Sequence, residues 1–457
     1  MNYRMNTLKA VIATLKCPDY LPEEIVNKLL EFLFFKVAVA TNGDHTIILT
    51  KDGTVFACGK NSFGQLGLGD EKQRNTFTAV PILPDGKVAK QVIAGKNHSM
   101  ILTEDGTVFA CGGNYHGQLG LGDTTHRNTF TAVRSLPDGK VAKQVIAGEV
   151  HSMILTEDGT VFACGCNGRG QLGLRYSNQS NTFYSNTFTA VSALPDGKVV
   201  KQIAAGATYT IILAKDGTMF SCGNVYGRHR SETLTAVKVS LPDGQVAKQV
   251  VAGYDHTMII SEDGRVFASS SSAIPRSVAP PPRSLPSGKI AMQLTSGQFH
   301  TTILTKDGTV FTHGYNYHGQ LGLGDEDRRN TFNAVPALPD GKVAKQVIAG
   351  GSHTMIIAQD GTVFACGLNC FWQLGLGDTK NRNTFTAVPA LPEGVVAKQV
   401  NAGLRHTTIL TEDGTVFTCG CNYHGQLGLG DTKDRKTLTA VPALPEAVVI
   451  KQAVAGS

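Results

Sequence analysis

VAKQVIAGKNHSMILTEDGTVFACGGNYHGQLGLGDTTHRNTFTAVRSLPDGK, residues 88–140, is one copy of a segment that the 457-residue chain repeats with few changes. A repeat of this length indicates a propeller or a solenoid, in which each unit buries its apolar face against its neighbours. Because the copies are so alike, residues that all of them share are interpreted as scaffold, and function is sought where they differ. The Asp-Gly-Thr-Val-Phe core of the segment recurs at intervals of 44–58 residues, with two variant copies, beginning at Asp52, Asp105, Asp158, Asp216, Asp263, Asp307, Asp360 and Asp413.

Each copy is typical of four short strands. In this one, strands are expected at 88–95, 98–103, 107–112 and 128–133. Asp-Gly between the second and third strands is a hairpin signal, and glycines in the loop before the fourth supply the positive φ that tight turns need. Four antiparallel strands in about 50 residues is the size of one propeller blade.

The motifs AGxxHT, DGTVFACG and NYHGQLGLGD recur in order and resemble the regulator-of-chromosome-condensation repeat over residues 37–457. The resemblance implies an all-β fold, a closed β-propeller of four-stranded blades. Family members usually have seven blades, whereas this chain has eight copies, of which the fourth and fifth (206–297) lack the GQLGLG loop. Eight blades are expected, with seven blades and a degenerate unit as the alternative.

The two ends of the repeat region bear on how the ring closes. Residues 36–42 and 451–456 both look like the first strand of a copy, so one of them is surplus to eight blades. A propeller must cover its edge strands, and the spare strand could latch the ring.

Composition limits the functions to consider. The net charge of +6 is not gathered in a tail, so a nucleic-acid-binding stripe is not indicated. The CGC triplets at 164–166 and 419–421 lack the CxxC spacing of a zinc site, and we expect no metal and no cofactor. Six cysteines share one repeat position, too far apart for disulfides between blades, and are interpreted as small buried thiols of a reducing compartment: Cys58, Cys111, Cys164, Cys222, Cys366 and Cys419.

A histidine follows two variable residues in seven of the eight copies, and Tyr209 replaces it in the fourth. A residue that recurs in every blade is interpreted as a structural hydrogen-bonding group, and the same holds for the aspartate of DGT and the arginine of the RNTF segments. The seven histidines are His45, His98, His151, His256, His300, His353 and His406.

The two residues before each histidine vary strongly between flanks that are nearly identical. In a propeller these eight loops lie around one rim of one face, where mixed acidic, basic and aromatic side chains suit a protein partner. Neutral drift on exposed turns is the alternative. The pairs are Gly43-Asp44, Lys96-Asn97, Glu149-Val150, Ala207-Thr208, Tyr254-Asp255, Gln298-Phe299, Gly351-Ser352 and Leu404-Arg405.

The family resemblance implies a partner for this face, the small GTPase Ran, which founding members bind through it. It also implies that acidic loop residues matter for nucleotide exchange; Asp255 fits best, and Glu149 and Asp44 are the other acids. Phe299 departs from the family pattern, which has a further histidine there. The expected partner-binding residues are Asp44, Asn97, Glu149, Tyr254, Asp255, Phe299 and Arg405.

Trp372 is the only tryptophan, and its segment FWQLGLG stands where other copies have YHGQLGLG. Two interpretations remain open for it, an exposed anchor for a partner and a local packing group.

Residues 1–36 stand outside the repeat and are expected to be helical. Pro22 and the acids after it make a sound helix start, and LPEEIVNKLLEFL resembles the opening of an F-box, which binds the Skp adaptor of cullin ubiquitin ligases. A cap packed against the ring is the alternative. The adaptor-binding residues would be Leu21, Pro22, Ile25, Leu29, Leu30 and Leu33.

An F-box fragment before such repeats resembles secreted Legionella effectors that act on host Ran. No signal peptide is visible, so the resemblance implies non-classical secretion into the host cytoplasm, and otherwise a cytoplasmic protein. No stretch is expected to span a membrane, and a monomer is expected.

Two functions therefore remain open. The first is a nucleotide exchange factor that needs no catalytic side-chain chemistry. The second is a substrate receptor of a cullin ubiquitin ligase, in which the propeller holds the target. A hydrolase or lyase is disfavoured, because no unique His/Asp/Glu cluster remains once the repeated positions are discounted.

Overall fold

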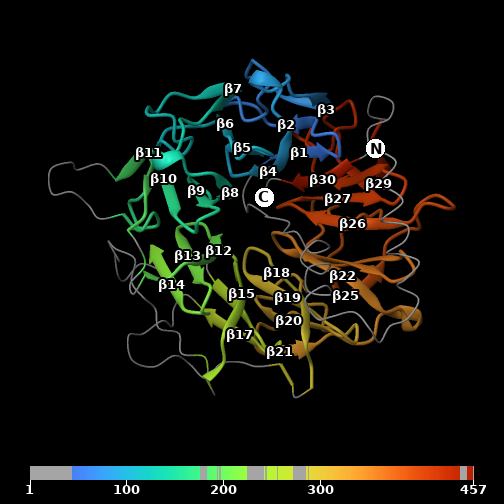
Figure 1. Ribbon diagram of the computed structural model, residues 1–457. Helices are drawn as coiled ribbons and strands as arrows, with labels where there is room; N and C mark the ends of the chain where they lie inside the picture. The colour runs from blue at the N-terminus through green and yellow to red at the C-terminus, as the bar shows by residue number, and fades with distance from the viewer. Residues whose placement is uncertain are drawn as a thin grey trace, which may run out of the picture. The chain divides into compact units, whose positions relative to one another are not determined.

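The computed structural model describes residues 44–174, 183–192, 194, 197–223, 241, 244–254, 256–270, 285–286, 288–442 and 450–455. Within these ranges the protein is an all-β propeller of eight sheets (Figure 1). Six sheets have four described strands and two have three. The prediction of eight blades is confirmed, and the alternative of seven is wrong.

The innermost strands contact one another in a closed circle, each touching the innermost strands of both neighbouring blades. They are β30 (Ile450–Ala455), β4 (Ala89–Ala94), β8 (Ala142–Ala147), β12 (Val200–Ala205), β15 (Ala247–Ala252), β18 (Ala291–Ser296), β22 (Ala344–Ala349) and β26 (Ala397–Ala402).

The second strand of each blade begins at the repeated histidine or at Tyr209. These strands are β1 (His45–Thr50), β5 (His98–Thr103), β9 (His151–Thr156), β13 (Tyr209–Ala214), β16 (His256–Ser261), β19 (His300–Thr305), β23 (His353–Ala358) and β27 (His406–Thr411).

The third strands follow the Asp-Gly turns. They are β2 (Val55–Gly59), β6 (Val108–Gly112), β10 (Val161–Cys166), β14 (Met219–Gly223), β17 (Val266–Ser270), β20 (Val310–Gly314), β24 (Val363–Gly367) and β28 (Val416–Gly420).

Outer strands are described in six blades: β3 (Arg74–Ala79), β7 (Arg127–Ala132), β11 (Tyr184–Ala190), β21 (Arg329–Ala334), β25 (Arg382–Ala387) and β29 (Arg435–Ala440). Among the described residues, three short 3-10 turns precede innermost strands: η1 (Pro84–Gly86), η2 (Pro137–Gly139) and η5 (Pro339–Gly341).

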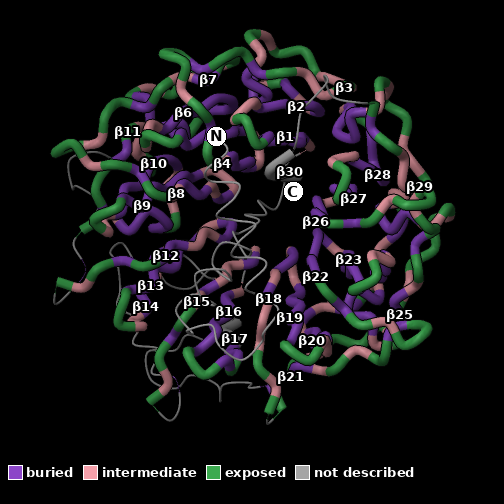
Figure 2. Tube along the Cα trace, turned by 45° about the vertical axis from the view of Figure 1, so that its right-hand side comes forward, coloured by how far each residue is buried: buried purple, intermediate pink, exposed green. Residues whose placement is uncertain are grey.

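The apolar core lies between neighbouring sheets. One cluster joins Ile47 of β1 to Val92 of β4 and Phe109 of β6, and so spans two blades. All six residues of most second strands are buried, because a blade covers each of their faces; this explains why HSMILT does not alternate apolar and polar residues. Figure 2 shows exposed residues mainly in the connecting loops.

The ring closes inside one sheet. β30, from the end of the repeat region, pairs antiparallel with β1 and supplies the innermost strand of the first blade. Of the two candidate latch strands, 451–456 takes this place, while 36–42 lies outside the described residues. The predicted domain boundary after residue 36 also lies outside them.

No helix in the described ranges is long and apolar enough to cross a membrane.

Candidate functional site: the variable loop face

The repeated histidines form a belt of hydrogen bonds that links each blade to the next. His98 Nε2 lies 2.9 Å from Ser152 Oγ of the following blade, and His353 Nε2 lies 3.1 Å from Thr407 Oγ1. The belt closes on itself, since His406 of the last blade reaches Thr46 of the first at 3.3 Å. In the fourth blade the Tyr209 hydroxyl donates instead to the His256 carbonyl at 2.6 Å. The histidines are therefore structural, as the sequence analysis predicted.

Burial keeps six of these histidines neutral. Each ring donates from Nε2, and Nδ1 of five of them lies buried without a hydrogen-bond partner, so a second proton would be buried unpaired. Desolvation accordingly lowers the pKa to about 4 or about 3. The value is about 4 for His45, His151 and His406 and about 3 for His98, His300 and His353.

A glutamine carbonyl in each GQLGLG loop forms a second link between blades. The Gln65 carbonyl accepts the Ser99 hydroxyl at 2.7 Å and lies 3.5 Å from the Cys111 thiol, both from the next blade. The six repeated cysteines are buried free thiols, which confirms that part of their prediction. Burial raises their pKa, in Cys222 and Cys419 to about 12.

The fourth and fifth copies lack the GQLGLG loop, and the blades that follow them lack the cysteine. Ser269 and His313 occupy the cysteine position there, opposite Thr257 and Thr301. The thiol is thus lost in the two blades whose preceding copy has no glutamine loop. Loop and cysteine vary together, so both belong to the scaffold.

The variable pairs and the GQLGLG loops lie on the same face of the propeller. The Gly113 amide donates to the Asn97 carbonyl at 2.7 Å, and the Tyr315 amide donates to the Phe299 carbonyl at 3.0 Å. We call this surface the loop face. The opposite surface, which carries the Asp-Gly turns and the starts of the innermost strands, is called the turn face.

Neighbouring variable pairs touch around the loop face. Lys96 Nζ lies 2.5 Å from Glu149 Oε1 across the boundary of the second and third blades. Between the sixth, seventh and eighth blades, the Gln298 amide donates to the Gly351 carbonyl at 3.4 Å, and the Gly351 amide to the Gly403 carbonyl at 3.1 Å. The most variable positions of the repeat therefore form neighbouring parts of one surface.

The acidic candidates on this face lie close to basic groups. The Glu149 side chain is only 16% exposed and pairs with Lys96. Asp44 lies 3.9 Å from Lys60 and 3.7 Å from His424 of the last blade. Asp255, which the resemblance favoured, lies outside the described residues.

Aromatic rings form a continuous row over the fifth and sixth blades. Tyr254 and Phe299, both from variable pairs, have ring centroids 5.6 Å apart. Phe299 continues to Tyr315 at 5.4 Å, and Tyr315 to Tyr317 at 5.5 Å. The Arg328 guanidinium lies 4.6 Å from the centre of the Tyr315 ring. We call these five residues the aromatic row. The sequence analysis did not predict three of them, Tyr315, Tyr317 and Arg328. Variation of the NYHG segment between copies was a signal that could have pointed to Tyr317.

A second aromatic and cationic group lies on the seventh and eighth blades. Arg405 is exposed, and its guanidinium stacks 4.5 Å from the centre of the Phe371 ring. The neighbouring Trp372 is half-buried and has a φ of 58°, in a turn where other copies have glycine at positive φ. A bulky residue in this region is strained, and such strain often accompanies function.

The strand that faces Trp372 has changed with it. In other blades a Cβ on this glycine would meet the asparagine of the next outer strand; for Gly319 it would lie 2.5 Å from Asn383 Cα. Opposite Trp372 the strand has Lys436 in place of asparagine and Leu438 in place of phenylalanine. Both interpretations of Trp372 therefore have support, partial packing and partial exposure.

The remaining site predictions are placed as follows. Asn97 is half-buried and its carbonyl joins the two loops described above. Three tyrosines that the sequence analysis did not single out are among the most exposed aromatic side chains of the face: Tyr115, Tyr317 and Tyr423, 63–74% exposed. The F-box-like residues Leu21 to Leu33 lie outside the described part of the chain. Over the described ranges, no group of three His, Cys, Asp or Glu side chains could hold a metal ion.

Comparison with known proteins agrees with this architecture. The family model described as RCC1-like domain matches residues 17–273 and again residues 186–457. The chain is 27% identical to the ultraviolet-B receptor UVR8 of Arabidopsis thaliana over 414 residues, which is 89% of this chain and 81% of the receptor. It is 41% identical to human X-linked retinitis pigmentosa GTPase regulator over 145 residues, 32% of this chain but only 14% of that protein.

Among solved structures, Prp20p of Saccharomyces cerevisiae superposes with a TM-score of 0.60 at 21% identity, covering 88% of both chains. At this identity the likeness shows the fold alone. That structure was described together with the binding of Prp20p to Gsp1p and histones.

Proposed function

Because the chain belongs to the RCC1-like domain family, we propose that it is a protein-binding regulator that promotes guanine nucleotide exchange on a small GTPase. Ran is the GTPase to test first, since the repeat resembles that of Ran-binding propellers. The loop face is the proposed binding surface. The name of the retinitis pigmentosa GTPase regulator and the Gsp1p binding described for Prp20p support a GTPase partner at the level of the family.

The observation that carries the proposal is the contrast between the belt and the loop face. The repeated histidines and the repeated glutamine carbonyls form structural hydrogen bonds between neighbouring blades. The varying residues instead gather on one surface with tyrosines, phenylalanines and arginines, residue types that are enriched at protein interfaces, tyrosine and arginine also among their hot spots. Selection for a partner accounts for this distribution, whereas drift on exposed turns does not require an arginine stacked on an aromatic ring.

Exchange needs differential binding and no catalytic group. A partner that binds the nucleotide-free GTPase more tightly than the nucleotide-bound form weakens nucleotide affinity by the same factor. The aromatic row and Arg405 are the contacts we assign to the GTPase, while the Lys96–Glu149 pair holds two loops in place. Asp255 remains a predicted contact.

Release of fluorescent GDP from purified Ran, with other small GTPases as controls, tests this function. The full chain is expected to accelerate release, and Arg405→Ala or the double change Tyr254→Ala and Phe299→Ala to slow it about tenfold or more, as for interface hot spots. Lys306→Ala removes an exposed cation from the turn face and serves as the matched control. Absence of acceleration with every GTPase would contradict the proposal.

The ubiquitin-ligase alternative stays a prediction, because its adaptor-binding residues lie outside the described ranges. Delivery into a host cytoplasm is likewise part of the proposal, and a translocation reporter fused to the chain would test it.

A further inference from the structure

The turn face carries a circle of exposed lysines that the proposed function does not use. Each lysine is the second residue of an innermost strand, and every described one is exposed; Met292 takes the position in β18. We call these residues the lysine ring: Lys90, Lys143, Lys201, Lys248, Lys345 and Lys398.

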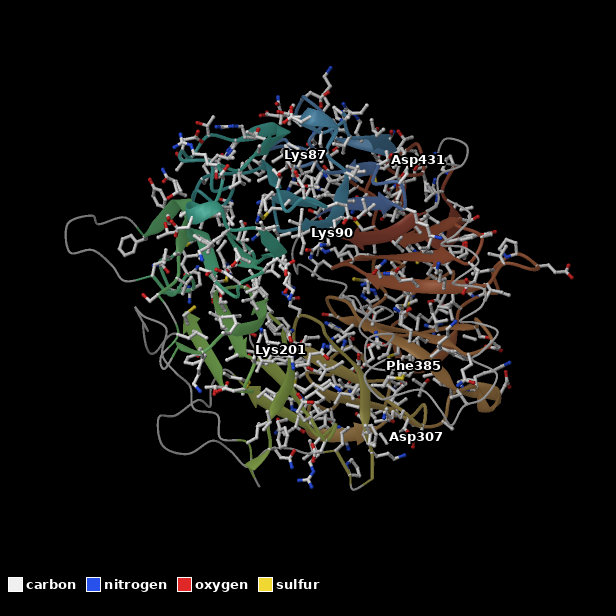
Figure 3. All side chains as sticks on the ribbon, viewed as in Figure 1. Lys87, Lys90, Lys201, Asp307, Phe385 and Asp431 are labelled. Carbon is white, nitrogen blue, oxygen red and sulfur yellow. The ribbon has the colours of Figure 1, made fainter. Side chains whose placement is uncertain are left out.

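The innermost strands bring these lysines together from distant parts of the sequence. Because these strands contact one another in a closed circle, the six lysines lie around one centre, with Met292 between Lys248 and Lys345. Figure 3 labels Lys90 on β4 and Lys201 on β12, both beside the middle of the ring of blades.

Most of the lysine ring is not neutralised. Lys143 reaches Glu157 only at 4.0 Å, and Lys201 reaches Glu262 at 3.6 Å. In the part of the chain that the structure describes, the other four lysines form no ion pair. A circle of like charges around one centre raises the local concentration of anions.

Another lysine of the repeat behaves differently and shows what a structural lysine looks like here. The lysine of LPDGK pairs with the aspartate of the next Asp-Gly turn, as in Lys342 to Asp360 at 2.5 Å, and holds the pKa of that carboxyl down. Lys87–Asp105, Lys140–Asp158, Lys198–Asp216 and Lys289–Asp307 repeat the pair. The scaffold thus needs these lysines for turns, but makes no comparable use of the lysine ring.

Aliphatic side chains lie beside the lysines. One flank of each packs on the Asp-Gly turn of the preceding blade, so that a Cβ on Gly53 would lie 2.3 Å from Val88 Cγ1. Their other flank is in solvent. These residues are 41–48% exposed: Val88, Val141, Val199, Val246, Ile290, Val343 and Val396.

The residue types narrow the partner. Nucleic-acid surfaces stack bases on aromatic rings or arginine, and phosphate sites favour the bidentate arginine fork. The lysine ring and the aliphatic residues beside it contain neither aromatic residues nor arginine. Ammonium groups alternating with β-branched aliphatics match a chain that carries both carboxylates and aliphatic side chains. We propose that the centre of the turn face binds an acidic, leucine- or valine-rich polypeptide segment, independently of the loop face.

A fluorescein-labelled peptide of alternating glutamate and leucine residues tests the proposal by anisotropy with the full chain. Binding is expected at low salt and should weaken as salt screens the charges. The triple change Lys90→Gln, Lys345→Gln and Lys398→Gln removes three exposed cations and should weaken binding about tenfold, which is about 1.4 kcal/mol. The matched control is Lys72→Gln, Lys380→Gln and Lys433→Gln, three exposed lysines that precede outer strands at the loop face.

Two further arms separate the contributions. The same peptide with glutamine for glutamate should lose binding, and Val343→Thr with Val396→Thr, which keeps the side-chain shape, should weaken binding without changing its salt dependence. Equal weakening by both lysine triples would overturn the proposal, as would absence of peptide binding. Tighter binding of single-stranded DNA that is lost in the ring triple would replace it with a nucleic-acid surface.

Discussion

At the scale of single residues, histidine shows how a repeated polar group can be part of a core. Six of the seven belt histidines give their one proton to a hydroxyl of the next blade, and that hydroxyl in turn donates to a glutamine carbonyl, as in His98, Ser152 and Gln118. The chain of bonds satisfies buried donors only while the histidine is neutral. The identity of the histidine thus follows from its need to donate once and stay uncharged.

This arrangement predicts a pH dependence of stability. Burial lowers the folded-state pKa of six histidines to about 3 or about 4. Below a pH of about 6.5 these histidines therefore bind protons in the unfolded chain but stay neutral in the folded chain. The free energy of unfolding should be fully retained above that pH and fall as the pH drops toward 4. Each histidine contributes up to about 1.4 kcal/mol per pH unit.

Urea unfolding between pH 8 and pH 4.5, roughly the range in which histidine titrates, measures this dependence. His353→Gln removes one of these titrating groups, so it should reduce the slope of the free energy of unfolding against pH by the contribution of one histidine. A flat profile until the carboxylates titrate would show that the histidines are not buried as described.

The glycines of the GQLGLG loops permit a second test at this scale. Gly64 has a φ of 77°, and a Cβ there would lie 2.4 Å from Asn128 Cα of the next blade, whereas Gly86 has a φ of 63° and open space around it. Gly86→Ala should cost about 1 kcal/mol for the left-handed backbone alone. Gly64→Ala should cost about 3 kcal/mol, since the next blade must also move. Equal losses in thermal unfolding would argue that this loop is not packed against the next blade.

At the scale of elements, neighbouring blades are held together where the GQLGLG loop of one blade packs on the strands of the next. The loop's glutamine carbonyl binds the second and third strands of the neighbour, and a single bridge pairs the loop with its outer strand, as between Leu68 and Thr129. A blade without this loop, such as the fourth, joins its neighbour through other groups. Tyr209 provides that contact, beside the bond from Gln202 to the Val250 carbonyl at 2.6 Å, which Gln91 and Val145 also form in a blade that has the loop.

Ser152→Ala tests this link between blades. The change removes the hydroxyl that accepts from His98 and donates to the Gln118 carbonyl at 2.8 Å, leaving His98 Nε2 unsatisfied and the carbonyl with only the Cys164 thiol. We expect a loss of about 1–3 kcal/mol in the free energy of unfolding. Ser185→Ala removes an exposed hydroxyl from an outer strand and should change it by less than about 0.5 kcal/mol. A loss at Ser185 as large as that at Ser152 would contradict the assignment.

Strands were predictable from the sequence to within one or two residues, because Asp-Gly turns and glycines mark their ends: 98–103 is β5, and 88–95 contains β4. The position of the variable pairs on one face follows from the repeat alone. Contacts between side chains of different blades do not. Nothing local to Glu149 indicates Lys96, and nothing near Arg405 indicates Phe371, since each pair depends on how two sheets pack.

At the scale of the whole molecule, closure decides whether the propeller holds together. β30 is the only described strand of its sheet that comes from the other end of the repeat region, and Ala453 faces Ile48 in β1. The sequence predicted a spare strand but left two candidates, because 36–42 and 451–456 both look like the first strand of a copy. The pairing of β30 with β1 assigns the inner strand to the second candidate, and a pattern match cannot.

Deleting residues 450–457 should therefore cost at least about 5 kcal/mol, comparable to the net stability of a domain, and expose the edge of β1 to association. Size-exclusion chromatography and thermal unfolding would detect both effects. Deleting only residues 456–457 is the control and should change neither. A synthetic peptide of residues 450–457, added in trans, should restore the monomer; a deletion variant that stays monomeric and stable would refute β30 as the closing strand.

Because β1 and β30 belong to one sheet, the first blade cannot be completed until residues 450–455 have been synthesised. Some 400 residues separate Thr50 from its partner Ile450, and a ribosome that adds about 5–20 residues per second needs roughly 20–80 s to bridge them. Throughout that interval the first blade leaves the ribosome without its inner strand, while later blades can already stack behind it. The first blade of a nascent chain is thus exposed to chaperones and proteases until residues 450–455 have been made, and a chain that stops before them lacks the strand that completes this blade.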